Sequence, residues 1–358
     1  MTVVTEVKPI DSRKIPLRFD VRHAVAFFFH DELGRLVVDL ERTGALSVQF
    51  DLEPQERDQL AGLSGEALWH WLEETGRQDV IDDLTYRQLT AAVVADASQF
   101  LCESLLACAK GKTAVAFALL RKPLKENLLL LEWLLAFPED FLARFHGEST
   151  WDYTLNRLPL PERRRVLREA SRRVDLPGID EEFLWVVRYS KEYPNSLETL
   201  WTKATHLVTS AKASATESGN LNFIFSSESA IEEQWEHYYR VVPLILYYFL
   251  QVAESVAFRF VEPDPRFLPM KSLLRNLAFM RYAESKSPDE VASFEPDAFW
   301  TDLGEIAFEC EDCRQEVSIR DQNRDRVWVY GELKCENCSR VYDVWRDVVG
   351  EATDANGV

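Results

Sequence analysis

Four cysteines close to the end of this chain limit its fold more than any other feature of the sequence. They form two Cys-x2-Cys pairs, Cys310 with Cys313 and Cys335 with Cys338, and twenty-one residues separate the pairs. The segments EVSIR and RVWVYGEL lie between the pairs, joined by the polar stretch DQNRD, and SRVYDVW follows the last cysteine. Alternation of β-branched, aromatic and polar residues is typical of short strands. We therefore expect residues 302–350 to form a small β module that brings the two pairs together.

This module resembles a zinc ribbon from Glu309 to about Trp345, in residue types, spacing and strand pattern. The resemblance implies that the four cysteines bind one Zn²⁺ ion tetrahedrally through their thiolates. Four protein ligands fill the coordination sphere, so the metal would be structural and would leave no position for substrate or water. One departure is that Arg314 and Ser339 stand directly after the second cysteine of each pair, where typical ribbons have glycine.

Two other uses of the same cysteines stay open. Two disulfides would require an oxidising compartment, and a rubredoxin-like iron site would use the same four thiolates. The first fourteen residues, MTVVTEVKPIDSRK, contain no apolar segment of the kind found in secretory signals. The longest apolar stretch, Val241–Leu250, is too short for a membrane span and predicts a buried core helix. We therefore expect a cytoplasmic protein with reduced thiols and no membrane partner, in which zinc is the favoured ligand of the cysteines.

Residues 54–301 have the pattern of an α-helical body. Segments with helical spacing of apolar residues are expected at 85–110, 112–137, 161–174, 180–189, 196–210, 229–261 and 270–283. Thr85 with Gln88 and Ser229 with Glu232 match the capping box, which predicts helix starts at Thr85 and Ser229. The expected fold class is mainly α, a large helical bundle followed by a small C-terminal β zinc ribbon.

Three further segments are predicted to be less regular. Residues 1–53 have mixed character, with β-rich stretches at Ala24–Phe29 and Leu46–Phe50 around a short helix that Gly44 ends. Residues 210–229 form a small, polar loop that is long enough to suspect a role in function. Residues 351–358 are expected to be a disordered tail.

A formal net charge of −19 argues against a general nucleic-acid binder, because phosphate backbones are repelled. One segment is an exception, since Arg157–Arg173 contains seven arginines and two acids. Arg164, Arg168 and Arg172 fall on one helical face and could bind RNA, DNA or a phosphorylated ligand through their guanidinium groups. Alternatively, this face pairs with the protein's own carboxylates. We favour that interpretation because the stripe lacks nearby aromatic stacking partners.

Charged residues also interrupt the segment LLRKPLKENLLLLEWLL, which is otherwise apolar on all sides. Charges on a buried helix must be paired or placed at a cavity, because leaving them alone costs several kcal/mol. Lys122 and Glu126 are spaced to pair with each other. Arg121 and Glu126 need partners from other helices, and His206 and Arg240 are candidates by residue type. If Arg121, Glu126 and His206 converge in one cleft, they are the candidate catalytic residues of a nuclease or nucleotide-processing enzyme.

A second resemblance covers roughly residues 83–254. It rests on a pattern of polar and aromatic residues in an apolar helical region, namely Arg121-x-Pro123-x2-Glu126, Trp133, His206 and the tyrosines from Tyr238 to Tyr248. In this pattern the chain resembles a broad set of uncharacterised bacterial all-helical proteins, some of them associated with abortive infection or phage-defence loci. The resemblance implies a helical fold and a shared polar cluster, and it implies no established reaction.

Other catalytic patterns are missing from the sequence. Gly111-Lys112-Thr113 looks like the end of a P-loop, but Leu106 stands where that motif needs glycine and the preceding residues are helical. No HExxH, HxH or GxSxG pattern occurs, and Cys102 and Cys108 are expected to be core thiols. The sequence therefore leaves open whether the body is an enzyme.

The expected function is an interaction or regulatory protein, with a role in bacterial defence as the expectation drawn from the resemblance. Residues 302–358 contain fourteen acidic and seven basic residues, a net charge of −7. This charge favours a protein partner or self-association for the four-cysteine module. A nuclease or nucleotide-processing enzyme and a nucleic-acid binder through the arginine-rich helix are the alternatives.

Overall fold

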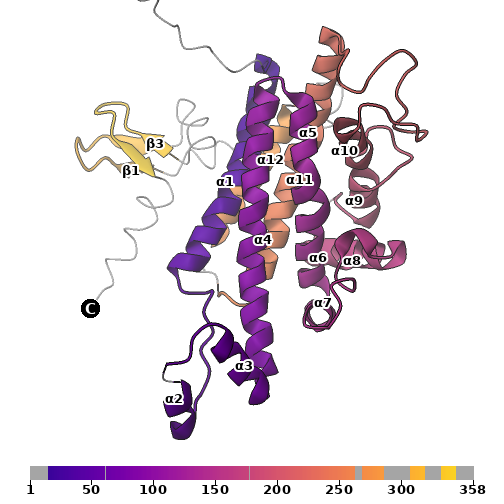
Figure 1. Cartoon of the computed structure of the whole chain (residues 1–358). Helices are drawn as coiled ribbons and strands as arrows, with labels where there is room; N and C mark the ends of the chain where they lie inside the picture. The colour runs from indigo at the N-terminus through magenta and orange to yellow at the C-terminus, as the bar shows by residue number, and fades with distance from the viewer. Residues whose placement is uncertain are drawn as a thin grey trace, which may run out of the picture.

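A computed structural model describes residues 15–60, 62–176, 178–262, 268–285, 307–318 and 332–343. Within these ranges the chain is mainly α-helical, and two small hairpins lie at its C-terminal end (Figure 1). The predicted fold class, a helical bundle with a small C-terminal β module, is confirmed. The predicted polar turn at 321–325 and the predicted tail at 351–358 lie outside the described residues.

Long helices form the centre of the bundle, namely α1 (Asp20–Arg42), α4 (Gln78–Ala109), α11 (Glu228–Ala257) and α12 (Leu268–Glu284). Helix α1 packs against the other three, and α11 packs against α1, α4 and α12. Much of the core belongs to α11, in which Tyr238, Tyr239, Val242 and Tyr248 are fully buried. The apolar stretch at 241–250 is therefore a core helix of the bundle, as its length predicted.

Shorter helices complete the bundle, namely α5 (Thr113–Lys122), α6 (Leu128–Ala136), α7 (Pro138–Phe145), α8 (Leu160–Val174), α9 (Glu181–Arg188) and α10 (Leu197–Thr205). Helix α5 packs along α4 and α10, and α6 packs against α8 and α11. Every residue of α6 except Leu130 is buried, which explains why its sequence is apolar on all sides. Gly111 lies between α4 and α5 with φ of 72°, so the P-loop-like stretch is a junction of two helices.

Helices α2 (Pro54–Leu60) and α3 (Glu66–Glu74) project from one end of α4, apart from the other helices (Figure 1). They enclose a hydrophobic cluster separate from the main core, made of Trp71, Leu72, Val80 and Ile81. Arg77 holds the lobe together, because its guanidinium lies 2.7 Å from the Glu56 carboxylate and stacks over the Trp71 ring. We call residues 48–84 the α2–α3 lobe.

The strands predicted at Ala24–Phe29 and Leu46–Phe50 are wrong. The first stretch lies inside α1, where Val25, Phe29 and Leu33 are buried on one face at helical spacing. Packing of that face against the bundle outweighs the β-propensity of valine and phenylalanine. The second stretch forms a turn and an extended segment that packs onto the lobe cluster. The helix that Gly44 was predicted to end is confirmed, but it begins at Asp20.

Both predicted capping boxes mark the wrong helix start. Helix α4 begins at Gln78, before Thr85, which is buried inside the helix. Helix α11 begins after Ser227, whose side chain accepts a hydrogen bond from the backbone N–H of Ala230. In α4 the buried face already begins at Val80, before the cap motif, and tertiary packing decides the boundary. In α11 the neighbouring Ser227 forms the cap in place of Ser229.

The helix predicted over residues 112–137 is interrupted. Residues Pro123–Asn127 form a π-helical turn between α5 and α6. Proline has no backbone N–H and clashes with the preceding turn of an α-helix. A wider turn at Pro123 keeps the chain helical on both sides of it.

Two helices, α4 and α11, are long and apolar enough to cross a membrane by length and composition alone. The most apolar window of α11 is 78% buried in the bundle, and that of α4 is 39% buried. This is weak evidence for a membrane span, because core helices of soluble proteins pass the same test.

The C-terminal module consists of two antiparallel hairpins. Strand β1 (Ala307–Glu309) pairs with β2 (Glu316–Ser318), and β3 (Glu332–Lys334) pairs with β4 (Val341–Asp343). Phe308 lies opposite Val317 in the first hairpin, and Leu333 lies opposite Tyr342 in the second. Strands β2 and β4 fall within the predicted strand segments, β3 overlaps the end of the segment RVWVYGEL and extends to Lys334, and β1 was not predicted.

Candidate functional site

Each hairpin of the C-terminal module carries one Cys-x2-Cys pair in its turn. In the first turn the backbone N–H of Cys310 donates to Gln315 and that of Arg314 donates to Cys310, both at 2.8 Å. The second turn repeats this pattern, with Cys335 donating to Arg340 at 2.8 Å and Ser339 donating to Cys335 at 2.9 Å. The two turns are therefore equivalent, and each directs two sulfur atoms to one side.

Arg314 and Ser339 adopt the left-handed conformation that glycine usually supplies at this position. Their φ angles are 61° and 66°, in the region where a Cβ atom crowds the backbone. The departure from the glycine pattern therefore strains two residues and leaves the turns intact. Both residues still donate the backbone hydrogen bonds that close the turns.

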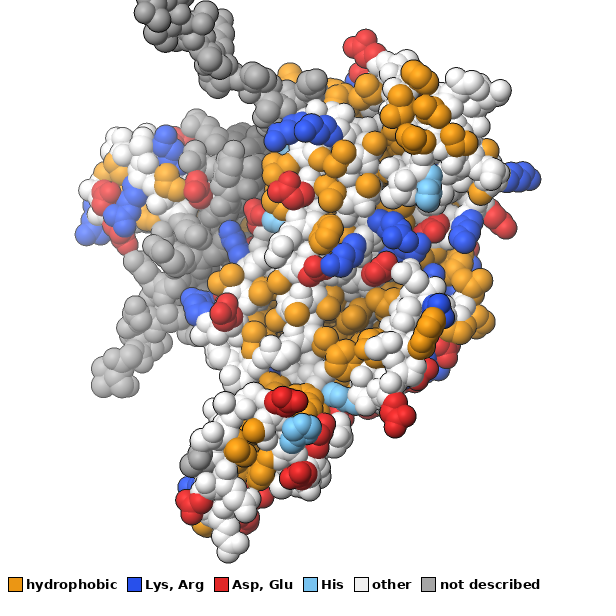
Figure 2. All heavy atoms as spheres, in the orientation of Figure 1, with side chains coloured by type: hydrophobic (Ala, Val, Ile, Leu, Met, Phe, Trp, Pro, Cys, Tyr) orange, Lys and Arg blue, Asp and Glu red, His pale blue; other side chains and the backbone are white. Residues whose placement is uncertain are grey.

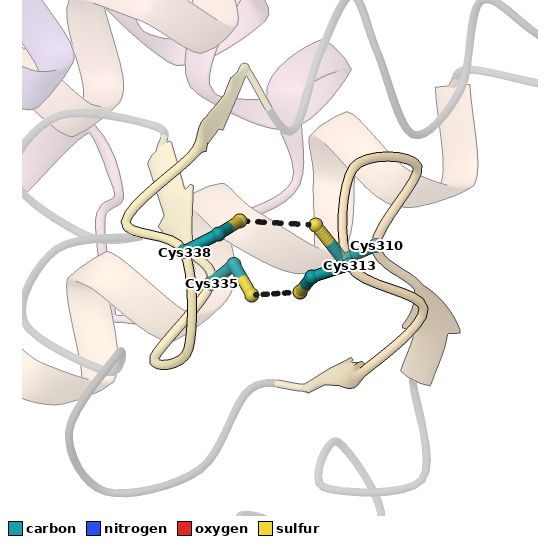
Figure 3. A group of neighbouring side chains, drawn as sticks. All are labelled: Cys310, Cys313, Cys335 and Cys338. Carbon is teal, nitrogen blue, oxygen red and sulfur yellow. Dashed lines mark hydrogen bonds between the residues drawn. The ribbon is translucent and has the colours of Figure 1, made fainter.

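The four sulfur atoms meet between the hairpins (Figure 3). All of them lie within 4.8 Å of one another. The Cys310 and Cys338 sulfurs are 3.5 Å apart, and so are those of Cys313 and Cys335, so each short distance joins one hairpin to the other. A tetrahedral ion with metal–sulfur bonds of about 2.3 Å has sulfurs about 3.8 Å apart. The four-cysteine cluster therefore has the geometry to hold a metal ion.

The surroundings of Cys310 and Cys313 favour thiolates. At Cys338 a hydrogen bond with the Arg340 backbone opposes burial and the other three cysteines, which together raise the pKa to about 12. The Tyr342 hydroxyl donates to the Cys310 sulfur at 3.0 Å and accepts the backbone N–H of Glu311 at the same distance. This hydrogen bond lowers the pKa of Cys310 to about 6. A hydrogen bond from the Asn337 side chain, together with the Gln315 backbone, lowers the pKa of Cys313. Thiolates are the form that binds metal, so both shifts assist binding.

Arg340 links the two cysteine turns through ion pairs. It follows the second Cys-x2-Cys pair, and its guanidinium forms ion pairs with Glu311 and Asp312 inside the first pair. Its charge also lies over the ring of Tyr342. One side chain thus connects both cysteine turns to the tyrosine that donates to Cys310.

The structure places Arg121, Glu126 and His206 in separate surroundings. Arg121 is exposed near the end of α5, and His206 is exposed at the end of α10. Glu126 lies half-buried in the π turn and accepts a hydrogen bond from the Asn156 side chain at 3.1 Å. Among the residues that the structure describes, no hydrogen bond or ion pair joins any two of the three.

The neighbouring lysines find partners on other helices. The Lys122 ammonium lies 2.7 Å from Asp96 of α4, and the expected pair with Glu126 is not formed. Lys125 lies 2.6 Å from Glu198 of α10, with both side chains largely buried. Arg240 contacts the Nδ1 atom of His237 at 2.9 Å. The two lysines therefore attach the end of α5 to α4 and the π turn to α10.

A fully buried ion pair of the body, Glu132 with Arg188, was not predicted. Both side chains are 0% exposed, and their closest atoms are 2.5 Å apart. Arg188 also donates from Nε to the carbonyl of Leu124 at 2.9 Å, and from Nη2 to the hydroxyl of Tyr189 at 2.9 Å. The Tyr189 hydroxyl donates to the carbonyl of Lys125 at 3.2 Å.

This cluster supplies hydrogen-bond donors to carbonyls of the π turn. Burial raises the pKa of Glu132, while the charge of Arg188 opposes that shift. Burial alone would lower the pKa of Arg188, and Glu132 outweighs it, so the guanidinium stays charged. The sequence signal was the single acid in LLLLEWLLA together with an arginine four residues after Leu184, on the apolar face of α9.

A second buried group joins α12 to the bundle. Arg275 of α12 forms an ion pair with Glu254 of α11, and both side chains are less than one-tenth exposed. Glu32 of α1 lies near them, where burial raises its pKa, and it accepts a hydrogen bond from Arg35 at 3.0 Å. Charges from three helices therefore meet in this part of the core.

The arginine stripe of α8 faces carboxylates of the same chain. Arg164 lies 3.0 Å from both Glu181 and Glu182 of α9, and Arg168 shares Glu181. Arg172 lies 2.8 Å from Glu169 on its own helix. Each guanidinium thus has an acidic partner within the chain.

The loop between α10 and α11 is tied by its own hydrogen bonds. The backbone N–H groups of Thr216 and Asn222 donate to the carbonyls of Thr209 and Leu207, both at 2.9 Å. Phe223 has a φ of 60° and lies near the ring of Phe117 in the body. The loop therefore has a defined conformation and lies against α5 at Phe117.

Comparison of the chain with known protein families, with curated proteins and with solved structures found no match. What can be said of its chemistry therefore rests on its own residues. Of the sites described, the four-cysteine cluster is the one whose geometry matches a defined ligand.

Proposed function

We propose that this protein is a cytoplasmic interaction protein whose four-cysteine module binds one structural zinc ion. The observation that carries the proposal is the meeting of four cysteine sulfurs, two from each hairpin, within 4.8 Å. Tetrahedral sulfur ligation is typical of zinc and of iron centres, and zinc favours it without any redox role. The reduced thiols fit a cytoplasmic location.

The zinc ion would connect two hairpins that have little core of their own. Each hairpin has strands of three residues, which is below the size that is stable alone. Four protein ligands leave the ion no open position, so its contribution is to hold a surface in shape. The net charge of −7 over residues 302–358 favours a basic protein surface as the partner, or self-association with a basic region of a second copy. A role in bacterial defence is supported by the resemblance of residues 83–254 alone.

Metal analysis tests the zinc proposal directly. Full-length protein purified under reducing conditions is expected to contain about one zinc per chain. The Cys313→Ser variant is expected to lose most of it, because three thiolates bind more weakly than four. The matched control is Cys102→Ser, which removes a half-buried thiol outside the cluster and is expected to keep the zinc. Iron in place of zinc, or equal loss of metal in both variants, would contradict the proposal.

The interaction role is tested with the same variants in cells. Cross-linking followed by mass spectrometry is expected to show partner contacts on residues 307–343 for the normal protein and for Cys102→Ser. Cys313→Ser is expected to lose those contacts and to keep the intramolecular cross-links of the helical body. If the contacts persist in Cys313→Ser, the module does not depend on the metal for binding.

A further inference from the structure

The α2–α3 lobe carries an apolar groove that the metal centre does not involve. Leu68, Trp69 and Leu72 of α3 line it together with Leu84 of α4, and the groove has a volume of about 550 Å³. It is open to solvent along the lobe. Figure 2 shows hydrophobic side chains among acidic and histidine side chains on this lobe. An open apolar groove of this kind is a common docking site for an amphipathic helix.

The groove follows from how α3 packs. Trp71 and Leu72 of α3 are buried in the lobe cluster with Val80 and Ile81 of α4. Leu68 and Trp69 pack against this cluster and are only partly buried, so each keeps some apolar surface exposed to solvent. A short helix that packs mainly through one side keeps a partly exposed apolar face beside that side.

The indole of Trp69 is held in place at the groove. Its Nε1 atom donates to the Glu73 carboxylate at 3.0 Å, and its ring lies 6.3 Å from that of His146. His146 in turn lies 3.2 Å from Asp82 of α4. A positioned tryptophan beside leucines is the kind of residue that contributes most to binding energy at protein interfaces.

The charge around the groove is strongly acidic. Residues 48–84 contain ten acids and two arginines, a net charge of −8 out of the −19 of the whole chain. Glu66, Glu73 and Asp82 stand near the groove with side chains 92%, 49% and 39% exposed. His70 lies 3.3 Å from Glu73 and 3.9 Å from Glu66, and it is the single basic side chain among the groove-lining residues. A ligand with an apolar face and basic flanks complements this surface.

We propose that this groove binds a basic amphipathic helix of a partner protein. The apolar side chains of the bound helix would cover Leu68, Trp69 and Leu84. The lysine or arginine side chains of that helix would face Glu66 and Glu73. An anionic membrane surface does not fit, because the carboxylates of the lobe repel its head groups. The site lies on a different part of the chain from the four-cysteine module, so this proposal stands apart from the zinc proposal.

A synthetic helical peptide tests the groove on the full-length, zinc-loaded protein. The probe is a fluorescein-labelled peptide of about 18 residues with leucine at helical spacing on one face and lysine on the other. Fluorescence anisotropy is expected to show saturable binding of one peptide per chain. The same peptide with glutamate in place of lysine, and a scrambled peptide of equal charge, are expected to bind much more weakly.

Two variants locate the binding. Glu66→Lys combined with Glu73→Lys is expected to weaken binding about tenfold, because it reverses two charges beside the groove. Leu84→Ala is expected to weaken it at unchanged net charge, since it removes apolar lining from α4. The matched control is Glu103→Lys combined with Glu192→Lys, which changes net charge equally at exposed positions away from the lobe and is expected to leave the Kd within about twofold.

The proposal is overturned if the normal protein does not bind the lysine peptide, or if the control pair weakens binding as much as the groove pair. It is also overturned if the glutamate or scrambled peptide binds equally well. Sedimentation of the protein alone provides a separate measurement. A dimer that the groove variants dissociate would show that a second copy of this chain occupies the groove instead. Circular dichroism shows whether each variant keeps its total helical content, and hydrogen exchange of residues 66–109 shows whether α3 and α4 are still folded.

Discussion

At the scale of single residues, the four-cysteine module tolerates two departures from the usual sequence. Arg314 and Ser339 hold the left-handed conformation with φ near 60°, where glycine is unstrained. The metal-binding geometry persists because the backbone hydrogen bonds of the turns and the ion pairs of Arg340 oppose this strain. These contacts thus keep both turns folded although neither has glycine at its left-handed position.

We expect Arg314→Gly and Ser339→Gly each to stabilise the module by about 1 kcal/mol, because glycine removes the crowding of Cβ in the left-handed region. Competition for zinc against a chromophoric chelator measures the gain as tighter metal binding. Gln315→Gly serves as the control, since this residue does not have a positive φ and its replacement is expected to weaken binding. Weaker binding in the first two variants would contradict the strain argument.

Glu126 is less buried than its sequence neighbours suggest. It lies half-exposed on the π turn, and its hydrogen bond comes from the neutral side chain of Asn156. Glu126→Gln is therefore expected to change the free energy of unfolding by less than about 1 kcal/mol, because the amide oxygen can accept the same hydrogen bond. Urea unfolding measures the change. A loss of several kcal/mol would show that the charge of Glu126 is needed for folding.

At the scale of elements, the π turn that begins at Pro123 and the buried side chain of Arg188 depend on each other. Pro123 has no N–H to donate, and the chain forms a π turn over Pro123–Asn127 that includes the carbonyls of Leu124 and Lys125. Arg188 of α9 and Tyr189 donate to those carbonyls. Glu132, one turn into α6, balances the charge that Arg188 brings into the core. A buried charge pair thus attaches α9 to the interruption between α5 and α6.

We expect Glu132→Gln to lower the free energy of unfolding by about 3–5 kcal/mol, because it leaves the guanidinium of Arg188 buried without a counter-charge. Arg188→Met is expected to cost a similar amount. The double variant Glu132→Leu with Arg188→Met is expected to cost less than the sum of the two single changes, since no uncompensated charge remains. Urea unfolding of all three proteins gives the coupling energy. Additive losses would show that the two side chains act independently.

At the scale of the whole molecule, the helical body and the four-cysteine module have different sources of stability. The body has an extensive buried core centred on α1, α4, α6 and α11. The module has strands of three residues and a few buried side chains, among them Val317, Leu333 and Tyr342, so a metal held by its four sulfur atoms would supply a large share of its stability. Loss of the metal should therefore affect one part of the chain and spare the other.

Removal of metal by a strong chelator under reducing conditions is expected to unfold the module and to leave the helical circular dichroism nearly unchanged. Hydrogen exchange should rise in residues 307–343 and stay low in α6 and α11. Adding zinc back is expected to restore protection of the module. A collapse of the helical signal on chelation would show that the body depends on the metal.

The sequence alone was sufficient to predict the helical class of the body and the four-cysteine cluster. Both depend on local information, since apolar residues at helical spacing define a helix and two Cys-x2-Cys turns define their own geometry. The helix at 180–189 was predicted nearly to its ends because Asp180 caps it directly. Where the capping residue and the start of the buried helical face coincide, the predicted helix boundary was correct.

Tertiary structure decided the features that depend on contacts between distant residues. Ala24–Phe29 became helical because α1 buries a continuous face against α4 and α11, which β-propensity cannot reveal. The partner of Glu132 lies on another helix, so spacing along the chain marks Arg188 as a residue of the buried face of α9 but does not assign it to Glu132. The pairing of the α8 arginines with α9 likewise required two helices to be placed side by side. Spacing along the sequence identifies the residues that lie on one face of a helix or strand. Which residues of two different helices contact each other depends on how the whole core packs.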